Sequence, residues 1–396
     1  MSILSGFSGR YRAFKELAAL RQDLKTYSDE LIKLRQENAV LSTECLRSKE
    51  AMMSTMNENN DLKRSLASLQ TTIPNESFME PSSYSDNEDD HQDSTTSPTF
   101  PTSEHLFLKT SVGEAQALEC DYSSSKFAVT GSSGDIEIYD GDSAQSPILS
   151  FSNDKPLTSL EFSKCGKFLF SGGSGRCIDV WDLAQVKLKS RLFAHQGKIC
   201  GISSAQDPCL LLSGAIDRKM LLWDTTKSTV RTTFNCNSSI NDVILSRHDD
   251  LAIAAHLSGT FSTWDTRSSS LVFQPPKLHS ARVSSVSLFK EHVVVTMARD
   301  NSICFTDLRN FEKVMEIKNP ALVVRSDSSS FCFSRDSRYL YAGSVDGKIL
   351  VFNTVNGDLE GEIKGRLSGA VISCRVVNDG HLLAVDKEGS LSLFKK

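Results

Sequence analysis

One segment of this sequence recurs seven times at a nearly constant interval. Each copy is a short run of alternating apolar residues that closes on an aromatic residue or Thr, often followed by an acidic residue. The closing positions lie 41 to 46 residues apart, and the closing pairs are Tyr139-Asp140, Trp181-Asp182, Trp223-Asp224, Trp264-Asp265, Thr306-Asp307, Phe352-Asn353 and Phe394-Lys395. Such a period is typical of proteins built as an array of repeats.

The alternation inside each copy predicts β-strands. Ile178 and Val180, which stand three and one residues before Trp181, show the pattern that nearly all copies share, and a period of two over a short run is typical of a strand. A second strand precedes it, followed by a turn rich in Gly, Asp and Ser. Several short strands per copy, at this interval, resemble WD40 repeats. The sequence therefore predicts an all-β seven-bladed WD40 β-propeller over residues 105–396.

The third copy carries the complete hydrogen-bonded tetrad of WD40 repeats, which is His195, Ser213, Asp217 and Trp223. A buried Asp needs donors, and an imidazole, a hydroxyl and an indole N–H can form a chain that ties the strands of one blade together. The same His, Ser and Asp suggest a hydrolase triad, but the Trp and the repeat register explain all four residues structurally. We therefore expect a structural tetrad, no catalytic residues and no enzyme.

The last copy ends after its third strand, so its blade lacks an outermost strand. Residues 105–109 precede the first copy and have no other partner in the pattern. We expect residues 105–110 to supply the closing strand of the last blade, which joins the ends of the ring and removes an open sheet edge.

Residues 17–69 carry a continuous heptad pattern without Pro or Gly. A pattern sustained over more than seven heptads predicts a coiled coil, which we place at residues 13–70, after a tail of residues 1–12. Ser48, Thr55 and Asn59 put polar groups into the middle of this helix. The expected core residues are Leu17, Leu20, Leu24, Tyr27, Leu31, Leu34, Asn38, Leu41, Leu62, Leu66 and Leu69.

The positions that flank the heptad core specify the partner helix. In a parallel pair, each flanking acidic residue meets the partner's basic residue five positions on. The four pairs are Glu16 with Arg21, Glu30 with Arg35, Glu44 with Lys49 and Glu58 with Lys63. Each exposed pair contributes only about 0.2–1 kcal/mol, but together they favour in-register pairing with a second copy, and a core Asn favours two strands. We expect a parallel homodimer.

Residues 71–104 form an acidic stretch, with eight acidic residues and no basic one. They are rich in Ser, Thr, Asn and Pro, a composition that cannot bury enough apolar surface to order itself. We expect a disordered, flexible linker. Ser83, Ser85 and Ser97 are candidate phosphorylation sites, although a plain solvated linker explains the same residues.

Composition and motifs argue against several other classes of protein. A net charge of −5 gives no case for a nucleic-acid partner. The ten cysteines include no Cys-x-x-Cys pair, which argues against a zinc site or a disulfide framework, and no cofactor motif is present. There is no signal peptide, membrane-spanning run or Gly at position 2. We expect a cytoplasmic protein whose contact with membranes is indirect or peripheral.

The order of coiled coil, acidic linker and seven-bladed propeller resembles the autophagy-related protein 16 family. The more specific likeness lies in short motifs of the fourth to seventh copies. They are Ser238-Ser239-Ile240-Asn241-Asp242-Val243, Trp264-Asp265-Thr266-Arg267-Ser268, Arg299-Asp300 followed by Asp307-Leu308-Arg309, Ala342-Gly343-Ser344 with Gly347, and Val385-Asp386-Lys387.

This resemblance implies a scaffold role. Family members dimerise through the coil and bind the conjugate of autophagy proteins 12 and 5. They place it on autophagosomal or endosomal membranes, where the ubiquitin-like autophagy protein 8 is joined to phosphatidylethanolamine, and their propeller docks adaptor peptides. The family usually has a separate helix ahead of the coil that grips autophagy protein 5. Only residues 1–16 precede the heptad here, so the sequence departs from the family's pattern at this contact.

The same features are compatible with other functions. The alternative is a coiled-coil WD40 adaptor of another pathway, such as a Groucho-like corepressor or a dynein-regulator-like protein. A nuclear corepressor should show a basic import cluster, and the sequence has none. The sequence contains no P-loop, zinc-hydrolase helix or nucleophile elbow, which argues against an enzyme. A phosphoinositide-binding propeller would carry an adjacent Arg-Arg-Gly motif, and the sequence has none.

A binding face of the propeller is predicted from basic residues in its loops. In WD40 domains the turn after the second strand opens on the narrower face, and two further basic residues follow His195 and its equivalent His279 by three positions. We expect a basic rim that receives acidic peptides, with ordinary solvated loop charges as the alternative. Its residues are Arg176, Lys198, Arg218, Arg282 and Arg299.

Overall fold

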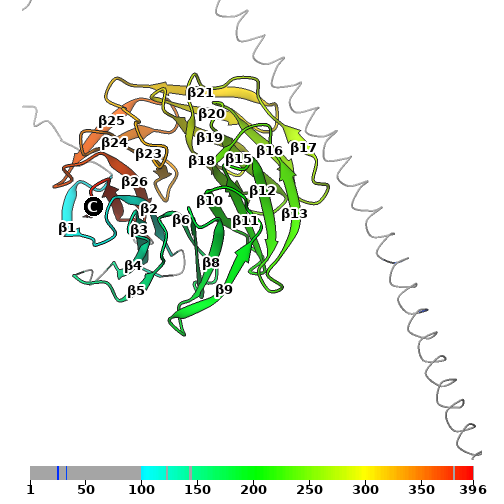
Figure 1. Cartoon of the computed structure of the whole chain (residues 1–396). Helices are drawn as coiled ribbons and strands as arrows, with labels where there is room; N and C mark the ends of the chain where they lie inside the picture. Colours follow the sequence, from blue (N-terminus) through cyan, green and yellow to red (C-terminus); the bar gives the residue numbers. More distant parts are fainter. Residues whose placement is uncertain are drawn as a thin grey trace, which may run out of the picture. The chain divides into compact units, whose positions relative to one another are not determined.

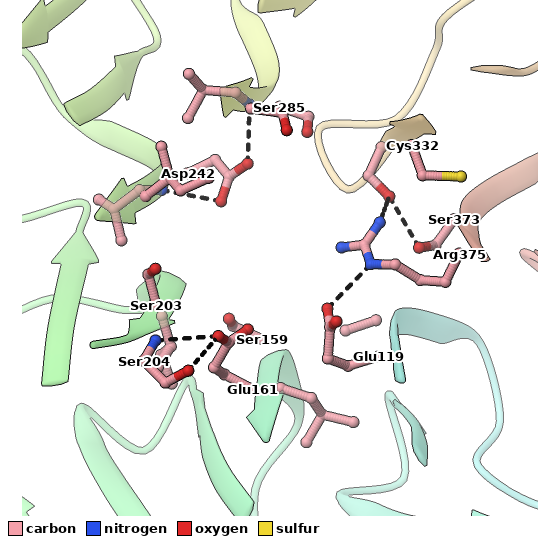
Figure 2. A pocket seen from close by; sticks show the side chains of 18 of the residues that line it. Glu119, Ser159, Glu161, Ser203, Ser204, Asp242, Ser285, Cys332, Ser373 and Arg375 are labelled. Atoms are coloured by element: carbon pink, nitrogen blue, oxygen red, sulfur yellow. Dashed lines mark hydrogen bonds and ion pairs between the residues drawn. The ribbon is translucent and has the colours of Figure 1, made fainter. Parts of the chain in front are cut away.

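The part of the chain that the structure describes is a ring of seven sheets. The computed structural model describes residues 100–121, 124–141, 145–377 and 380–395, together with Lys25 and Lys33. Seven four-stranded antiparallel sheets, one per blade, surround a central channel (Figure 1), and side chains of the innermost strands line it (Figure 2). The chain thus folds as a seven-bladed WD40 β-propeller, as the repeat pattern predicted.

The N-terminal predictions fall almost wholly outside the described residues. Lys25 and Lys33 are exposed and helical. The tail of residues 1–12, the rest of the coiled coil of residues 13–70, and the acidic linker as far as residue 99 are not described, so these assignments stay predictions.

In six blades the strands run outward from the channel in chain order. Blade 1 contains β2 (Ala115–Cys120), β3 (Lys126–Gly131), β4 (Asp135–Asp140) and β5 (Leu149–Ser152). Blade 2 contains β6 (Leu157–Phe162), β7 (Phe168–Gly173), β8 (Cys177–Asp182) and β9 (Lys187–Phe193). Blade 3 contains β10 (Ile199–Ser204), β11 (Leu210–Ala215), β12 (Lys219–Asp224) and β13 (Thr229–Asn235).

The same order holds on the other side of the ring. Blade 4 contains β14 (Ile240–Leu245), β15 (Leu251–His256), β16 (Phe261–Asp265) and β17 (Leu271–Phe273). Blade 5 contains β18 (Val283–Phe289), β19 (Val293–Ala298), β20 (Ser302–Asp307) and β21 (Glu312–Lys318). Blade 6 contains β22 (Phe331–Phe333), β23 (Tyr339–Gly343), β24 (Lys348–Asn353) and β25 (Leu359–Lys364).

Blade 7 is built from both ends of the propeller. It contains β26 (Val371–Val376), β27 (Leu382–Asp386), β28 (Ser390–Lys395) and, as its outermost strand, β1 (Ser103–Lys109). β1 runs antiparallel to β28, with Ser103 opposite Lys395 and Lys109 opposite Ser390. The segment expected to close the ring is therefore hydrogen-bonded to β28. Because β28 also pairs with β27, neither of its edges is left open.

The propeller begins before the boundary that composition suggested. Phe100 is buried, and it packs over Gly361 of β25, where a Cβ would lie 2.6 Å from the ring. The Glu104 carboxylate accepts a hydrogen bond from the Ser392 hydroxyl at 2.6 Å. Residues 100–104 were assigned to the acidic linker, but they belong to the propeller because their partners come from blades 6 and 7, far away in the sequence.

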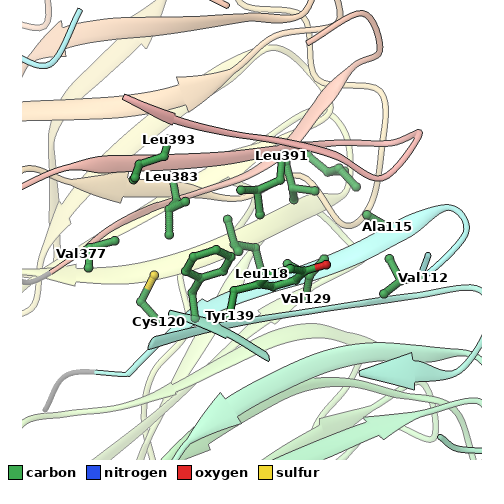
Figure 3. Packing of buried hydrophobic residues seen from close by; sticks show 13 residues of the cluster. Val112, Ala115, Leu118, Cys120, Val129, Tyr139, Val377, Leu383, Leu391 and Leu393 are labelled. Carbon is green, nitrogen blue, oxygen red and sulfur yellow. The ribbon is translucent and has the colours of Figure 1, made fainter. Parts of the chain in front are cut away.

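Apolar side chains pack between neighbouring blades. The residues three positions before the seven closing positions are all fully buried, and they are Ile136, Ile178, Met220, Phe261, Ile303, Ile349 and Leu391. Between blades 1 and 7, Leu118 and Val129 share one cluster with Leu383 and Leu393 (Figure 3). Packing therefore joins the first blade to the last, in addition to the backbone pairing of β1 with β28.

Candidate protein-binding face

The predicted tetrad of blade 3 forms one continuous hydrogen-bonded chain. The Nδ1 of His195 lies 3.0 Å from the Asp217 carboxylate, and its Nε2 lies 2.8 Å from the Ser213 hydroxyl. The indole N–H of Trp223 donates to the same hydroxyl at 2.8 Å. The His195 tautomer that fits these contacts donates from Nδ1 to Asp217. Ser213 then donates its hydroxyl proton to Nε2, and every polar side-chain atom that links the tetrad is paired.

The tetrad holds the blade together and is not arranged for hydrolysis. Burial lowers the pKa of His195, so its imidazole is neutral at neutral pH. Burial opposes ionisation of Asp217, but hydrogen bonds from the backbone N–H of Gln196 and from His195 hold its pKa below the usual range. Ser213 is wholly buried and bonded to two rings. Its hydroxyl therefore cannot reach a substrate.

Four other blades build a polar link at one shared position. This position lies two residues before the closing residue, in the third strand of the blade, and it holds Glu137, Asp179, Ser262 and Ser392. The Glu137 carboxylate accepts hydrogen bonds from the hydroxyls of Tyr139 and Ser111. The Asp179 carboxylate accepts hydrogen bonds from the side-chain amide of Asn153 at 2.6 Å and from the Nε of Arg191 at 2.8 Å. Ser262 accepts the indole N–H of Trp264 at 2.9 Å and lies 2.8 Å from His256 Nε2, while Ser392 bonds Glu104.

These four links were not predicted, although the sequence contains a signal for them. Each of the four polar residues is buried in a third strand whose other buried positions are apolar, apart from Thr263 in β16 and Ser390 in β28. A buried polar side chain needs a hydrogen-bond partner. Polar residues at one repeat position therefore indicate a second site of linkage, even where the tetrad itself has been lost.

Three of the five predicted basic residues lie on turns and loops of blades 2 and 3. Arg176 and Arg218 occupy the turns after β7 and β11, with positive φ angles of 61° and 65°, and both are exposed. Lys198 precedes β10, and its carbonyl accepts the backbone N–H of Ile216 at 3.0 Å. The turn of Arg218 and the loop of Lys198 therefore lie together on one face of the ring, and Arg176 stands on the neighbouring blade.

Arg282 and Arg299 lie together in blade 5, but they are not isolated cations. The backbone N–H of Arg299 donates to the carbonyl of Arg282 at 2.9 Å. The Nη1 atoms of the two side chains both lie 3.3 Å from the carboxylate of Asp327. The predicted rim did not include Asp327. The face therefore carries mixed charge at blade 5 and exposed positive charge at blades 2 and 3.

The channel behind this face has a polar wall. Its volume is about 860 Å³, and side chains from the innermost strands line it (Figure 2). Glu161 of blade 2 accepts the backbone N–H and the hydroxyl of Ser204 in blade 3, at 3.0 and 2.7 Å. Asp242 of blade 4 accepts the backbone N–H of Val286 in blade 5 at 2.9 Å, and burial raises its pKa to about 6. These carboxylates link neighbouring blades, so they support the ring.

Three further findings concern the residues that the structure describes. No helix among them is both long enough and apolar enough to cross a bilayer. They include no group of three or more His, Cys, Asp or Glu side chains placed to hold a metal ion. The nine cysteines within the described ranges are all free thiols.

A known family matches three segments of the chain. The family described as WD domain, G-beta repeat, matches residues 145–182, 186–224 and 324–353. These segments end at the closing pairs of the second, third and sixth copies. The match therefore identifies WD40 repeats independently of the fold.

Three relatives show how far the likeness extends. The chain is 23% identical to protein tipD of Dictyostelium discoideum over 386 residues, which is 86% of this chain and 59% of tipD. It is 24% identical to autophagy-related protein 16 of Arabidopsis thaliana over 375 residues, 93% of this chain and 73% of that protein. It is also 24% identical to human protein NEDD1 over 241 residues, 59% of this chain and 36% of NEDD1. The chain thus spans less than two thirds of tipD.

Proposed function

We propose that this protein is a dimeric, non-enzymatic scaffold of autophagy, similar in role to autophagy-related protein 16. In this role it positions the conjugate of autophagy proteins 12 and 5, so that autophagy protein 8 is joined to phosphatidylethanolamine. The coil supplies the dimer, and the propeller is a docking platform for adaptor peptides. The protein is cytoplasmic and reaches autophagosomal or endosomal membranes peripherally.

One observation carries this proposal, namely that the likeness to the Arabidopsis protein extends beyond the propeller. Residues 103–395 are 293 of the 396 residues, or 74% of the chain. The alignment with autophagy-related protein 16 covers 93% of the chain, so part of it must fall ahead of β1, where the heptad pattern lies. The NEDD1 alignment covers 59% and needs no residue outside the propeller.

The test is recovery of autophagy protein 5 by the full-length chain. The tagged chain is expressed in cells, and bound autophagy protein 5 is measured after affinity purification. Purified chain is then added to the conjugate, the lipidation enzymes and liposomes, and lipidated autophagy protein 8 is measured. We expect recovery of autophagy protein 5 and faster lipidation. Absence of both results would contradict the autophagy role.

A coiled-coil WD40 adaptor of another pathway, Groucho-like or dynein-regulator-like, is the second candidate. The NEDD1 relative supports it, because its identity equals that of the Arabidopsis protein. This alternative predicts a dimer that captures partners through the propeller but recovers no autophagy protein 5. The same affinity purification therefore separates the two candidates.

The proposed docking face is the basic rim of Arg176, Lys198, Arg218, Arg282 and Arg299. Exposed positive charge attracts acidic peptides and raises their rate of association. We expect the double variant Arg176→Glu and Arg218→Glu to weaken partner capture without unfolding the domain. Arg231→Glu combined with Arg267→Glu makes the same charge change at two exposed positions outside the rim, and it is the matched control. Equal capture by the double variant and the wild type would contradict this face.

A further inference from the structure

The interval between the fifth and sixth closing residues is 46, against 41 or 42 elsewhere. The additional length lies between β21 and β22, where residues 319–330 form one long loop. The corresponding loop of blade 3, between β9 and β10, is residues 194–198. We call residues 319–330 the strap.

The strap reaches across the entrance of the channel. Its beginning is fixed in the core by the buried side chains of Leu322 and Val324. Further along, the carbonyl of Asp327 accepts the side-chain amide of Asn241 in blade 4 at 2.7 Å. The next residue, Ser328, donates its hydroxyl to Gln116 in blade 1 at 2.7 Å. Blades 1 and 4 stand three positions apart in a ring of seven, so these two bonds span the channel.

In the second half of the strap, the carboxylate of Asp327 bridges two arginines. Its Oδ2 and Oδ1 lie 3.3 Å from the Nη1 of Arg282 and of Arg299. The three side chains are 38% to 54% exposed. Charge-assisted hydrogen bonds of good geometry are shorter, about 2.7–2.9 Å, and partly exposed ion pairs are weak. An incoming carboxylate with better geometry has access to both guanidinium groups.

We propose that Arg282 and Arg299 form a carboxylate-binding site that Asp327 occupies in the free protein. An acidic peptide segment of a partner protein binds by taking the place of Asp327, and the strap then loses its ion pairs with blade 5. Lys198, which lines the same entrance from blade 3, meets a second acidic side chain of that segment. This inference rests on the proposed docking face and adds the regulation of its blade 5 portion by the chain's own Asp327.

The experiment measures peptide affinity in the full-length chain. The probe is a fluorescein-labelled peptide of alternating Glu and Ser, with the Gln analogue as the neutral control, and binding is followed by fluorescence anisotropy. We expect Asp327→Asn to bind the Glu peptide about tenfold more tightly, the scale set by two partly exposed ion pairs. Arg282→Gln with Arg299→Gln should lose most of the binding, and the Gln peptide should bind to none of the variants.

Two further variants keep the test specific. Asp346→Asn removes the same charge from an exposed turn of blade 6, and we expect the wild-type affinity. Gln116→Ala releases the strap from blade 1 without changing any charge, and we expect tighter binding than in the wild type. Thermal unfolding of each variant checks that the propeller is intact.

The outcomes separate this inference from the proposed function. Equal tightening by Asp327→Asn and Asp346→Asn would show an effect of net charge only and overturn the inference. Unchanged affinity in Asp327→Asn, together with loss in the double arginine variant, would also overturn it but leave the docking face intact. If the double arginine variant binds the Glu peptide as the wild type does, the inference and the blade 5 part of the docking face both fail.

Discussion

The carboxylate of Glu119 in blade 1 accepts a hydrogen bond from the Nε of Arg375 in blade 7, at 3.0 Å inside the channel. Glu119 is buried, and burial raises its pKa while Arg375 opposes that rise. Removing one partner of a buried ion pair leaves an uncompensated charge. We expect Arg375→Met to lower the free energy of unfolding by about 3 kcal/mol, measured by urea denaturation at pH 7.

The double variant tests whether this loss comes from the charge. Glu119→Met combined with Arg375→Met removes both ions, and apolar replacements of buried pairs are often neutral. We expect the double variant to recover most of the stability that Arg375→Met loses. A double variant as unstable as the single one would show that the other contacts of Arg375, to Ser330 and to the Cys374 carbonyl, carry the effect.

Ser213 connects both rings of the blade 3 tetrad, so its hydroxyl should be important for stability. Ser213→Ala leaves His195 Nε2 and the Trp223 N–H buried without their partner. We expect it to lower the free energy of unfolding by about 2 kcal/mol, measured by chemical denaturation. Ser190→Ala is the matched control, because the Ser190 oxygen is buried without a hydrogen-bond partner in the described structure. Equal losses in both variants would contradict the role of the tetrad.

His256 should make the propeller sensitive to acid. Burial lowers its pKa from 6.5 to about 4, because a charged imidazolium loses its hydration inside the blade. The unfolded chain therefore binds a proton first, so stability is lost as the pH falls from 6.5 towards 4, by about 3 kcal/mol in total. We expect His256→Leu to flatten the curve of unfolding free energy against pH over this range.

The comparison with the wild type isolates His256 from other titrating groups. The raised pKa of Asp242, about 6, acts with the opposite sign, because protonation of this buried group favours the folded state between pH 6 and 3.8. Both proteins retain Asp242, so its contribution cancels in the difference. An unchanged slope in His256→Leu would contradict the assignment.

The heptad pattern predicts that the full-length chain is a dimer. Leu24→Asp with Leu31→Asp places charges in the expected core, and we expect a monomer by light scattering after size exclusion. Lys25→Asp makes a charge change on the same helix at an exposed position and should leave the dimer intact. A monomeric wild type, or a dimer in the double Asp variant, would show that the coil does not pair as predicted.

The repeat could be predicted from the sequence because its signals are local. The period that ends at Trp181 and Trp223 depends only on neighbours in the chain, and the closing strand follows from a count of strands. The link between Ser262 and His256 was not predicted, because His256 stands at the end of a second strand, where the tetrad pattern has no place for a histidine. The sequence shows that Ser262 occupies a repeat position, but only the fold shows that His256 is its hydrogen-bond partner.

The binding face was predicted only in part, for a similar reason. Arg282 and Arg299 were placed by their offsets within the repeat, and the structure brings them together. Asp327 lies in the strap, whose length breaks the period, so no repeat position predicts where its carboxylate points. Contacts that cross the ring, such as the hydrogen bond between Ser328 and Gln116, cannot be predicted from the spacing of the repeats.

The pairing of β1 with β28 also sets the order of events during synthesis. Ser103 and Lys395, which are hydrogen-bonded in the finished sheet, are separated by 292 positions. At about 5–20 residues per second, β1 leaves the ribosome about 15 to 60 s before its partner strand. During that time the earlier blades can form, but β1 has an unpaired edge, which is a known route to aggregation. Blade 7 is therefore the last sheet to be completed, and its strand β1 stays unpaired until β28 has been synthesised.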